Sequence, residues 1–367
     1  MTKFFITISS IFILLSGKLS AQNPKFENLS LKIDYHYGFL LPEYSFISYF
    51  TDDAVRGFQV ETVKKLKGEK LWQRLYDYPS VSLAAYYGSL ANDTVFGKVV
   101  SLFPSFYFPL YRKNKTELFW QLGVGLAYST EKFDLTENYY NIAVATHLNI
   151  WFRAALDLKY NINDKIALSA GTAFGHFSNA NLSEPNIGLN FWTVYAGTDI
   201  SISKKTELNN EEIPPFKPGK EFALIIAGGG KHTRRFSEDY YFAGSVSGEF
   251  KKISGYKFAF GTGADFFYDE SVPEEMIRAG KEDVKNYYKI KTGIHISQEL
   301  IIGKLSLMIQ EGVYIGFTDH LDNYKMYNRG VVRYKFSEHF FADFAMKTNL
   351  NILDIAEIGI GWYANKK

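Results

Sequence analysis

Long segments with an apolar residue at every second position constrain the fold of this 367-residue chain more than any other feature. Successive residues of a β-strand point to opposite faces, so such a segment predicts a strand with one apolar face and one polar or small face. The pattern is present in segments 117–128, 147–159, 192–201 and 356–363. These segments exceed the about five or six residues of an ordinary strand. Aromatic residues also lie near the ends of their apolar faces, which favours an all-β, antiparallel transmembrane β-barrel.

The N-terminus and the composition are those of an exported membrane protein. Met1–Lys3, the apolar run 4–15 and the small residue Ala21 form the pattern of a secretory signal peptide. We expect residues 1–21 to be removed by cleavage before Gln22. The aromatic residues, 32 Phe, 26 Tyr and 5 Trp, make up 17% of the chain. With no helical span in the mature sequence, this composition predicts residence in the outer membrane.

Other classes of protein lack support in the sequence. The chain contains no Cys, which excludes disulfides, thiol catalysis and thiolate metal sites. Its formal net charge of +2 does not indicate binding to nucleic acid. We expect no cofactor and no metal site, because the seven His residues are dispersed without ligand spacing.

The alternating segments predict about sixteen strands, an even number typical of bacterial barrels. Their predicted starts lie near residues 29, 55, 80, 97, 116, 146, 165, 189, 220, 241, 256, 287, 304, 327, 339 and 355. Short turns at 161–164, 254–255 and 337–338 are expected in the periplasm. Long polar segments at 39–54, 130–145, 270–286 and 317–326 are expected outside the cell.

A charged linker with three prolines, 205–219, follows the eighth predicted strand. It divides the mature chain into a first barrel region, 22–204, and an additional β-strand region, 220–367. Two architectures remain open. The additional strands either complete one barrel of about sixteen strands, or form a second eight-stranded unit.

The alternation also predicts which residues face lipid and which face the barrel interior. We expect outward positions for Leu148, Ile150, Trp192 and Val194, and inward positions for Arg153, Asp157 and Asp199. The inward set, with His147 and Lys159, fits either a hydrated pore or an interior filled by charged side chains.

His176 and Ser178 are candidates for ester chemistry at the end of one apolar strand face. They are two residues apart, so they share a face, with Cα atoms about 6–7 Å apart. That face also carries Leu168 and Phe174. A base and a nucleophile at the outer end of an apolar face indicate chemistry on a lipid. His295 and Ser297 have the same spacing but no comparable context.

The stretch 175–197 resembles the signature of the lipid A 3-O-deacylase (PagL-type) and acyloxyacyl-hydrolase-like outer-membrane proteins. The resemblance rests on His-x-Ser-Asn at 176–179, Asn-x-Gly at 186–188 and the aromatic strand that follows. A looser resemblance, to an eight-stranded barrel, extends over 22–204. It implies a carboxylic ester hydrolase in which Ser178 is the nucleophile, His176 the general base and Asn179 a stabiliser of the oxyanion.

The resemblance also implies the substrate and one departure from the family. The substrate would be an acyl chain of lipid A or lipopolysaccharide in the outer membrane. The acid that orients the base is replaced by Asn190, whose parity places it on the face of His176, and Glu184 is the nearby carboxylate that could substitute. Two alternatives remain open, a non-catalytic structural or binding barrel and a channel or transporter. The sequence does not determine the oligomeric state.

Overall fold

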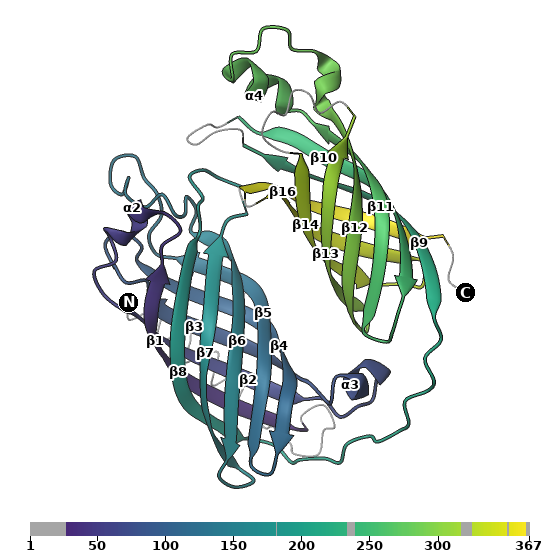
Figure 1. Ribbon diagram of the computed structural model, residues 1–367. Helices are drawn as coiled ribbons and strands as arrows, with labels where there is room; N and C mark the ends of the chain where they lie inside the picture. The colour runs from purple at the N-terminus through teal and green to yellow at the C-terminus, as the bar shows by residue number, and fades with distance from the viewer. Residues whose placement is uncertain (1–26, 181, 233–238, 317–324, 351, 365–367) are drawn as a thin grey trace.

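The chain folds into two closed antiparallel barrels of eight strands each (Figure 1). This computed structural model describes residues 27–180, 182–232, 239–316, 325–350 and 352–364. The expected signal peptide and its cleavage point lie outside the described residues. The first barrel comprises β1 Leu29–Leu41, β2 Val55–Lys65, β3 Ser80–Ser89, β4 Lys98–Lys113, β5 Thr116–Ser129, β6 Leu148–Asn161, β7 Ile166–Ser178 and β8 Leu189–Ser201. The second comprises β9 Gly219–Lys231, β10 Tyr241–Ile253, β11 Phe258–Asp269, β12 Ile290–Ile302, β13 Leu305–Ile315, β14 Met326–Lys335, β15 Phe340–Asn349 and β16 Ile352–Tyr363.

Each barrel closes by pairing its first strand with its last. In the first barrel, β1 pairs with β2 on one side and with β8 on the other, from Ser30↔Ser201 to Leu41↔Asn190. In the second barrel, β9 pairs with β10 and with β16. The prediction of an antiparallel barrel is therefore confirmed. Of the two open architectures, the structure has two eight-stranded barrels rather than one barrel of sixteen.

Side chains fill the interiors of both barrels. In the lower half of the first barrel, Lys32 Nζ lies 2.8 Å from Asp157 Oδ1 and 3.2 Å from Asp34 Oδ2, and all three residues are buried. In the second barrel, Arg333 forms buried ion pairs with Asp343 and Glu249. A charge-filled interior, rather than a hydrated pore, is what eight strands allow.

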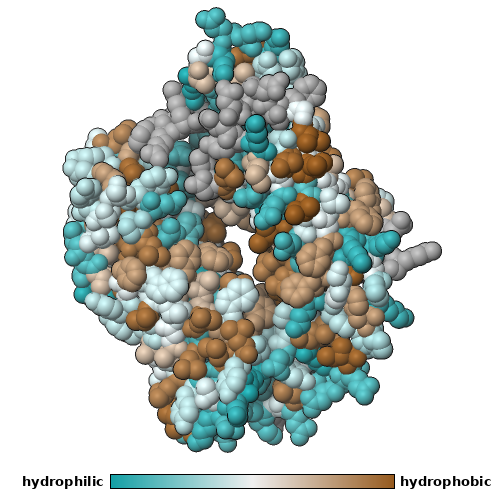
Figure 2. Space-filling model, viewed as in Figure 1, coloured by the Kyte–Doolittle hydropathy of each residue, from teal (hydrophilic) through white to brown (hydrophobic). Residues whose placement is uncertain are grey.

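The outward and inward parity follows the prediction. Leu148 and Val194 are 61% and 58% exposed, whereas Arg153 and Asp157 are 1% and 3% exposed. Trp192 is exposed and Asp199 is buried. In Figure 2, apolar residues gather around the middle of the view, and hydrophilic ones gather at its top and bottom.

The connections define two ends of the first barrel. Its loop end carries segments 42–54, 90–97, 130–147 and 179–188, with the short helix α2 Ser45–Ser48. Its short-turn end carries 114–115 and 162–165, but also the longer connection 66–79 with helix α3 Leu71–Leu75. In the second barrel, α4 Val272–Arg278 and the 3-10 helix η2 Asn286–Lys289 precede β12. None of the helices within the described ranges is long and apolar enough to span a membrane.

The two barrels lie side by side and touch at both ends. The linker leaves the first barrel at its short-turn end and runs up to β9 (Figure 1). At that end, the Tyr76 hydroxyl donates to Ile301 O at 2.9 Å. At the loop end, His232 Nε2 lies 3.2 Å from Leu182 O. The contact at Leu182 reaches segment 179–188, which follows Ser178 in the chain.

Candidate active site

The candidate site is built from three neighbouring strands of the first barrel. In the β6–β7 and β7–β8 ladders, His176 lies opposite Phe152 and Asn190, and Ser178 lies opposite Ile150. Residues directly opposite one another point to the same face of a sheet. His176, Asn190 and Phe152 therefore form one outward-facing row at the loop end, where His176 is half-buried.

A continuous hydrogen-bond chain links Asn190, His176 and Ser178. His176 Nδ1 lies 2.6 Å from Asn190 Oδ1, and His176 Nε2 lies 3.2 Å from Ser178 Oγ. A carboxamide oxygen can only accept, so Nδ1 carries the hydrogen of the neutral ring. Nε2 then has the free lone pair, and the Ser178 hydroxyl donates to it. This is the tautomer that a general base for a serine nucleophile needs.

Segment 179–188, in which the structure describes every residue except 181, covers Ser178, and Gly188 packs against His176 and Ser178. Ser178 is 9% exposed. Gly188 has φ +73, and a Cβ added to it would lie 2.7 Å from His176 Cε1 and 3.3 Å from Ser178 Cβ. Its N–H donates to Ala143 O at 2.9 Å, so the 130–147 loop fixes its position. Only glycine fits this position. Gly188 is a residue of the site whose sequence signal is the Asn-x-Gly of 186–188.

Asn179 organises the same segment. Its backbone N–H donates to Asn186 Oδ1 at 3.0 Å, and its Nδ2 donates to Ser183 O at 2.8 Å. The side chain is buried and its Oδ1 has no hydrogen-bond partner among the described residues. The backbone N–H and one Nδ2 hydrogen of Asn179 are thus engaged within the segment that follows Ser178.

The half-buried Glu184 lies in this segment as well. The position beside His176 Nδ1 is occupied by Asn190. The structure therefore brings His176, Ser178 and Asn190 together as one hydrogen-bonded group, and it places Asn179 and Glu184 in the covering segment.

An aromatic cluster inside the barrel supports the site from behind. Phe177 and Phe191 alternate with the outward site residues and are fully buried, as is Trp151. The Trp151 ring lies 6.2 Å from that of Phe177 and 5.3 Å from that of Phe191. Close-packed interiors have low compressibility. The cluster therefore gives the strand ends that carry His176, Ser178 and Asn190 a rigid platform.

The second His-x-Ser pair lies in a different environment. His295 and Ser297 face the interior of the second barrel, and each is 3% exposed. His295 Nδ1 lies 2.6 Å from Asp265 Oδ2, while Ser297 Oγ has no hydrogen-bond partner among the described residues. This pair belongs to the charged interior and has no access to lipid. Across the part of the chain that the structure describes, no group of three or more His, Asp or Glu residues could hold a metal ion.

Two family models match the chain. The model described as lipid A 3-O-deacylase (PagL) matches residues 56–199, and the model described as acyloxyacyl hydrolase, C-terminal domain, matches residues 220–366. The first match covers β2 to β8 and the candidate site, and the second covers β9 to β16. No curated protein sequence matches the chain.

Solved structures of outer-membrane barrels are also similar to parts of the chain. The outer membrane enzyme PagL is 17% identical, with a TM-score of 0.31, over 47% of this chain and 99% of that one. Neisserial surface protein A is 8% identical, with a TM-score of 0.34, over 47% and 97%. The Acinetobacter baumannii outer membrane protein Omp33 is 8% identical, with a TM-score of 0.19, over 91% and 97%.

Proposed function

Because the chain belongs to the PagL-type lipid A 3-O-deacylase and acyloxyacyl hydrolase family of outer-membrane barrels, we propose that it is a serine esterase that removes an ester-linked acyl chain from lipid A. The observation that carries the proposal is the hydrogen-bond chain from Asn190 through His176 to Ser178. Nucleophile, base and orienting group stand in the order that acyl transfer requires.

In the acylation half of the reaction, Ser178 Oγ attacks the ester carbonyl carbon. Its proton passes to His176 Nε2. This nitrogen lies 3.2 Å from Ser178 Oγ, and the distance between the two atoms shortens during the attack. Collapse of the tetrahedral intermediate breaks the bond to the sugar oxygen. His176 returns the proton to that oxygen, and the acyl chain remains on Ser178.

In the second half, water takes the place of the sugar hydroxyl. His176 Nε2 removes a proton from the water as it attacks the acyl-serine carbonyl. The intermediate collapses to a free fatty acid, and Ser178 Oγ regains its proton from His176. The two halves thus use the same base in the same tautomer, which Asn190 Oδ1 maintains through Nδ1.

The oxyanion of each intermediate needs hydrogen-bond donors close to Ser178. We assign this role to Asn179, whose N–H and Nδ2 are the first donors after the nucleophile. The N–H is engaged with Asn186 and one Nδ2 hydrogen with Ser183, which leaves the second Nδ2 hydrogen to donate to the oxyanion. Asn186 is the second candidate, because its Oδ1 is held by Asn179 N–H while its Nδ2 makes no hydrogen bond to another described residue. One such donor contributes about 3–4 kcal/mol to the transition state.

The position of the site suits a substrate that stays in the membrane. The outward face below His176 carries Phe174 and Trp192, whose rings are 6.4 Å apart, and the exposed Val194. An acyl chain lying along this face buries apolar surface while its ester reaches Ser178. With the loop end outside the cell, the site lies at the level of the outer leaflet, where lipid A resides.

Purified protein in detergent micelles provides the test. We expect release of a fatty acid from lipid A, detected by mass spectrometry, and covalent labelling of Ser178 by a fluorophosphonate. Ser178→Ala should lose both. The matched control is Ser297→Ala, which removes the serine of the interior pair and should retain both. Labelling without release would favour an esterase for another lipid, whereas neither labelling nor release would favour a non-catalytic barrel.

A further inference from the structure

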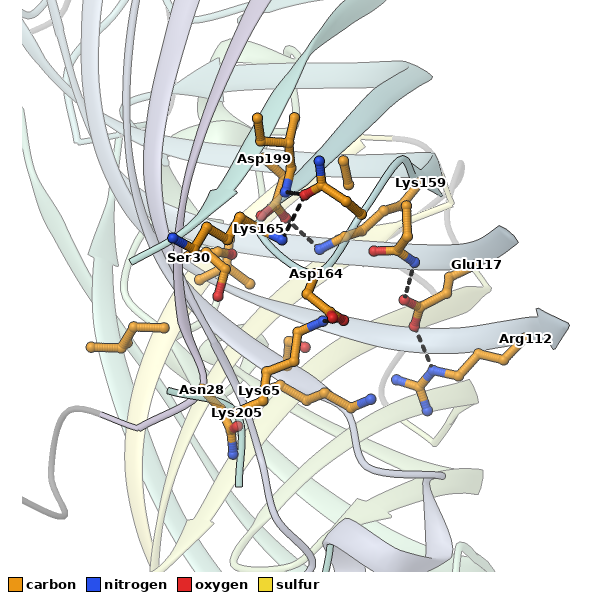
Figure 3. Close-up of a pocket in the computed structure, with 18 of the residues that line it drawn as sticks. Asn28, Ser30, Lys65, Arg112, Glu117, Lys159, Asp164, Lys165, Asp199 and Lys205 are labelled. Atoms are coloured by element: carbon orange, nitrogen blue, oxygen red, sulfur yellow. Dashed lines mark hydrogen bonds and ion pairs between the residues drawn. The ribbon is translucent and has the colours of Figure 1, made fainter. Parts of the chain in front are cut away.

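A cavity of about 250 Å³ opens at the short-turn end of the first barrel (Figure 3). Ser178 lies at the opposite end of this barrel, where β7 ends. The walls of the cavity are the ends of all eight strands, and the first residues of the linker cross beside it. Asn28 anchors the linker there, because its side chain bonds to Thr206 at 2.8 Å in both directions. A water molecule takes about 30 Å³, so the cavity has room for an anion with part of its hydration shell.

Positive charge exceeds negative charge in the lining of this cavity. Five cations, Lys65, Arg112, Lys159, Lys165 and Lys205, line it together with three carboxylates, Glu117, Asp164 and Asp199. Their difference is five minus three, so the lining carries a net charge of +2.

Ion pairing inside the cavity uses all three carboxylates. Lys159 Nζ pairs with Asp199 at 2.7 Å, Arg112 Nε with Glu117 at 2.8 Å, and Lys205 Nζ with Asp164 at 3.2 Å, as the dashed lines in Figure 3 show.

Two ammonium groups lie outside these direct ion pairs. Neither Lys65 Nζ nor Lys165 Nζ makes an ion pair or a hydrogen bond with another described residue. Lys65 is half-buried in the wall, and Lys165 is exposed at the rim. A half-buried lysine that no carboxylate contacts directly is stabilised when an anion from outside binds beside it.

The cavity ends blindly inside the barrel. Phe119 lines it and lies under Arg112, with the guanidinium 5.5 Å from the ring centre. Further in, the buried cluster of Lys32, Asp34 and Asp157 fills the interior. Walls of low dielectric constant around a cationic cleft concentrate its field and attract anions. Ser30, Ser80 and Asn163 add polar groups to the lining.

From this charge surplus and blind geometry, we infer that the cavity is a binding site for a phosphate group, with Lys65 and Lys165 as its ligands. The group enters from the short-turn end, which is the periplasmic side when the loop end faces outward. Its source is either a free phosphate in the periplasm or the headgroup of an anionic phospholipid in the inner leaflet. The site is independent of the esterase site at the opposite end of the barrel.

Calorimetric titration of the full-length protein in zwitterionic micelles with inorganic phosphate tests the free source. We expect saturable binding that Lys65→Met weakens about tenfold or more. The matched control is Lys113→Met, an exposed lysine at the same end that does not line the cavity, and it should bind as the wild type does. Heat-modifiable gel mobility reports folding, and acyl release from lipid A should be unchanged in both variants.

Native mass spectrometry of protein extracted from bilayers containing phosphatidylglycerol tests the lipid source. Retention of phosphatidylglycerol by the wild type and by Lys113→Met, but not by Lys65→Met, supports the headgroup. Saturable binding of phosphate that depends on Lys65 supports the free anion. If neither ligand binds, or if binding persists undiminished in a folded Lys65→Met protein, the inference is wrong.

Discussion

The Asn190 amide determines where the proton sits in the Ser178–His176 pair. By accepting from Nδ1 it leaves Nε2 free to accept from the serine, as the aspartate of a Ser-His-Asp triad does. Unlike aspartate, it carries no charge to stabilise the imidazolium that would form in the proposed reaction when His176 takes the serine proton. We therefore expect a working but slow catalyst.

Asn190→Asp adds that charge without changing the size of the side chain. A hydrogen bond to a charged group contributes about 1.5–3 kcal/mol. If it acts mainly in the transition state, kcat for acyl release rises about tenfold to a hundredfold. Steady-state kinetics on lipid A in micelles measure this. A kcat equal to or below that of the wild type would show that Asn190 is not the group that orients His176.

Gly188→Ala should abolish acyl release while the barrel stays folded. The added methyl must enter space occupied by His176 Cε1 and Ser178 Cβ, and the backbone at φ +73 is strained for alanine. Gly316→Ala is the control, because Gly316 also has a positive φ, +60, but its nearest neighbour would lie 3.8 Å away. Activity assays and gel mobility of both variants separate loss of the site from loss of the fold. Full activity of Gly188→Ala would contradict this packing.

At the scale of single residues, the sequence alone predicts which side chains of the candidate site share a face. The shared face of His176, Ser178 and Asn190 follows from parity, because the residues on β7 and β8 alternate regularly. The roles within segment 179–188 do not follow, since its hydrogen bonds join residues without a repeating pattern. The hydrogen bonds of Asn179 to Asn186 and Ser183 and the contact of Gly188 with His176 depend on three-dimensional loop geometry.

At the scale of the element, each strand has one apolar face and one polar or small face. The starts predicted for β1, β2, β3, β5, β8 and β10 coincide with the observed ones, because each begins where the alternation begins. The connection 66–79 departs from the expectation of short turns at its end of the barrel. It contains α3, whose residues contact the second barrel, and such a contact between distant segments leaves no local signal.

Val194→Lys tests the lipid-facing assignment of β8. Val194 lies near the middle of the strand and is 58% exposed, so a lysine there should cost about 2–4 kcal/mol of folding free energy in a bilayer. Tyr160→Lys, on the same outer face but near the end of β6, should cost about 0–1 kcal/mol. Urea unfolding in lipid vesicles measures both. Equal costs at the two positions would contradict the membrane embedding of the first barrel.

At the scale of the molecule, closure into two barrels is the feature that alternation leaves undetermined. The alternation of apolar and polar residues determines which face of each strand points outward, but it does not determine which strands pair. On the alternation alone, β8 could pair with β9 instead of β1. In the structure β8 pairs with β1, and β9 pairs with β16, so the connection 202–218 joins two separate barrels. The outcome decides between a pore and a filled interior, so strand pairing matters more to function here than strand count.

The contact between the barrels at the short-turn end is testable through Gly303. A Cβ on this residue would lie 2.6 Å from Trp72 Cδ1 of α3. Gly303→Ala should therefore push the barrels apart and broaden the distance distribution between spin labels placed on each. Gly280→Ala, with a similar φ of +75 and no neighbour within 4 Å, should leave the distribution unchanged. Identical distributions for both variants would exclude a rigid contact through α3.

The central claim is that Ser178 cleaves an acyl ester of lipid A in the outer membrane. Mass spectrometry of lipid A from cells that produce the wild type, Ser178→Ala or Ser297→Ala tests it most directly. We predict lipid A lacking one ester-linked acyl chain with the wild type and with Ser297→Ala, and intact lipid A with Ser178→Ala. Identical lipid A in all three, with each protein folded in the outer membrane, would contradict the account.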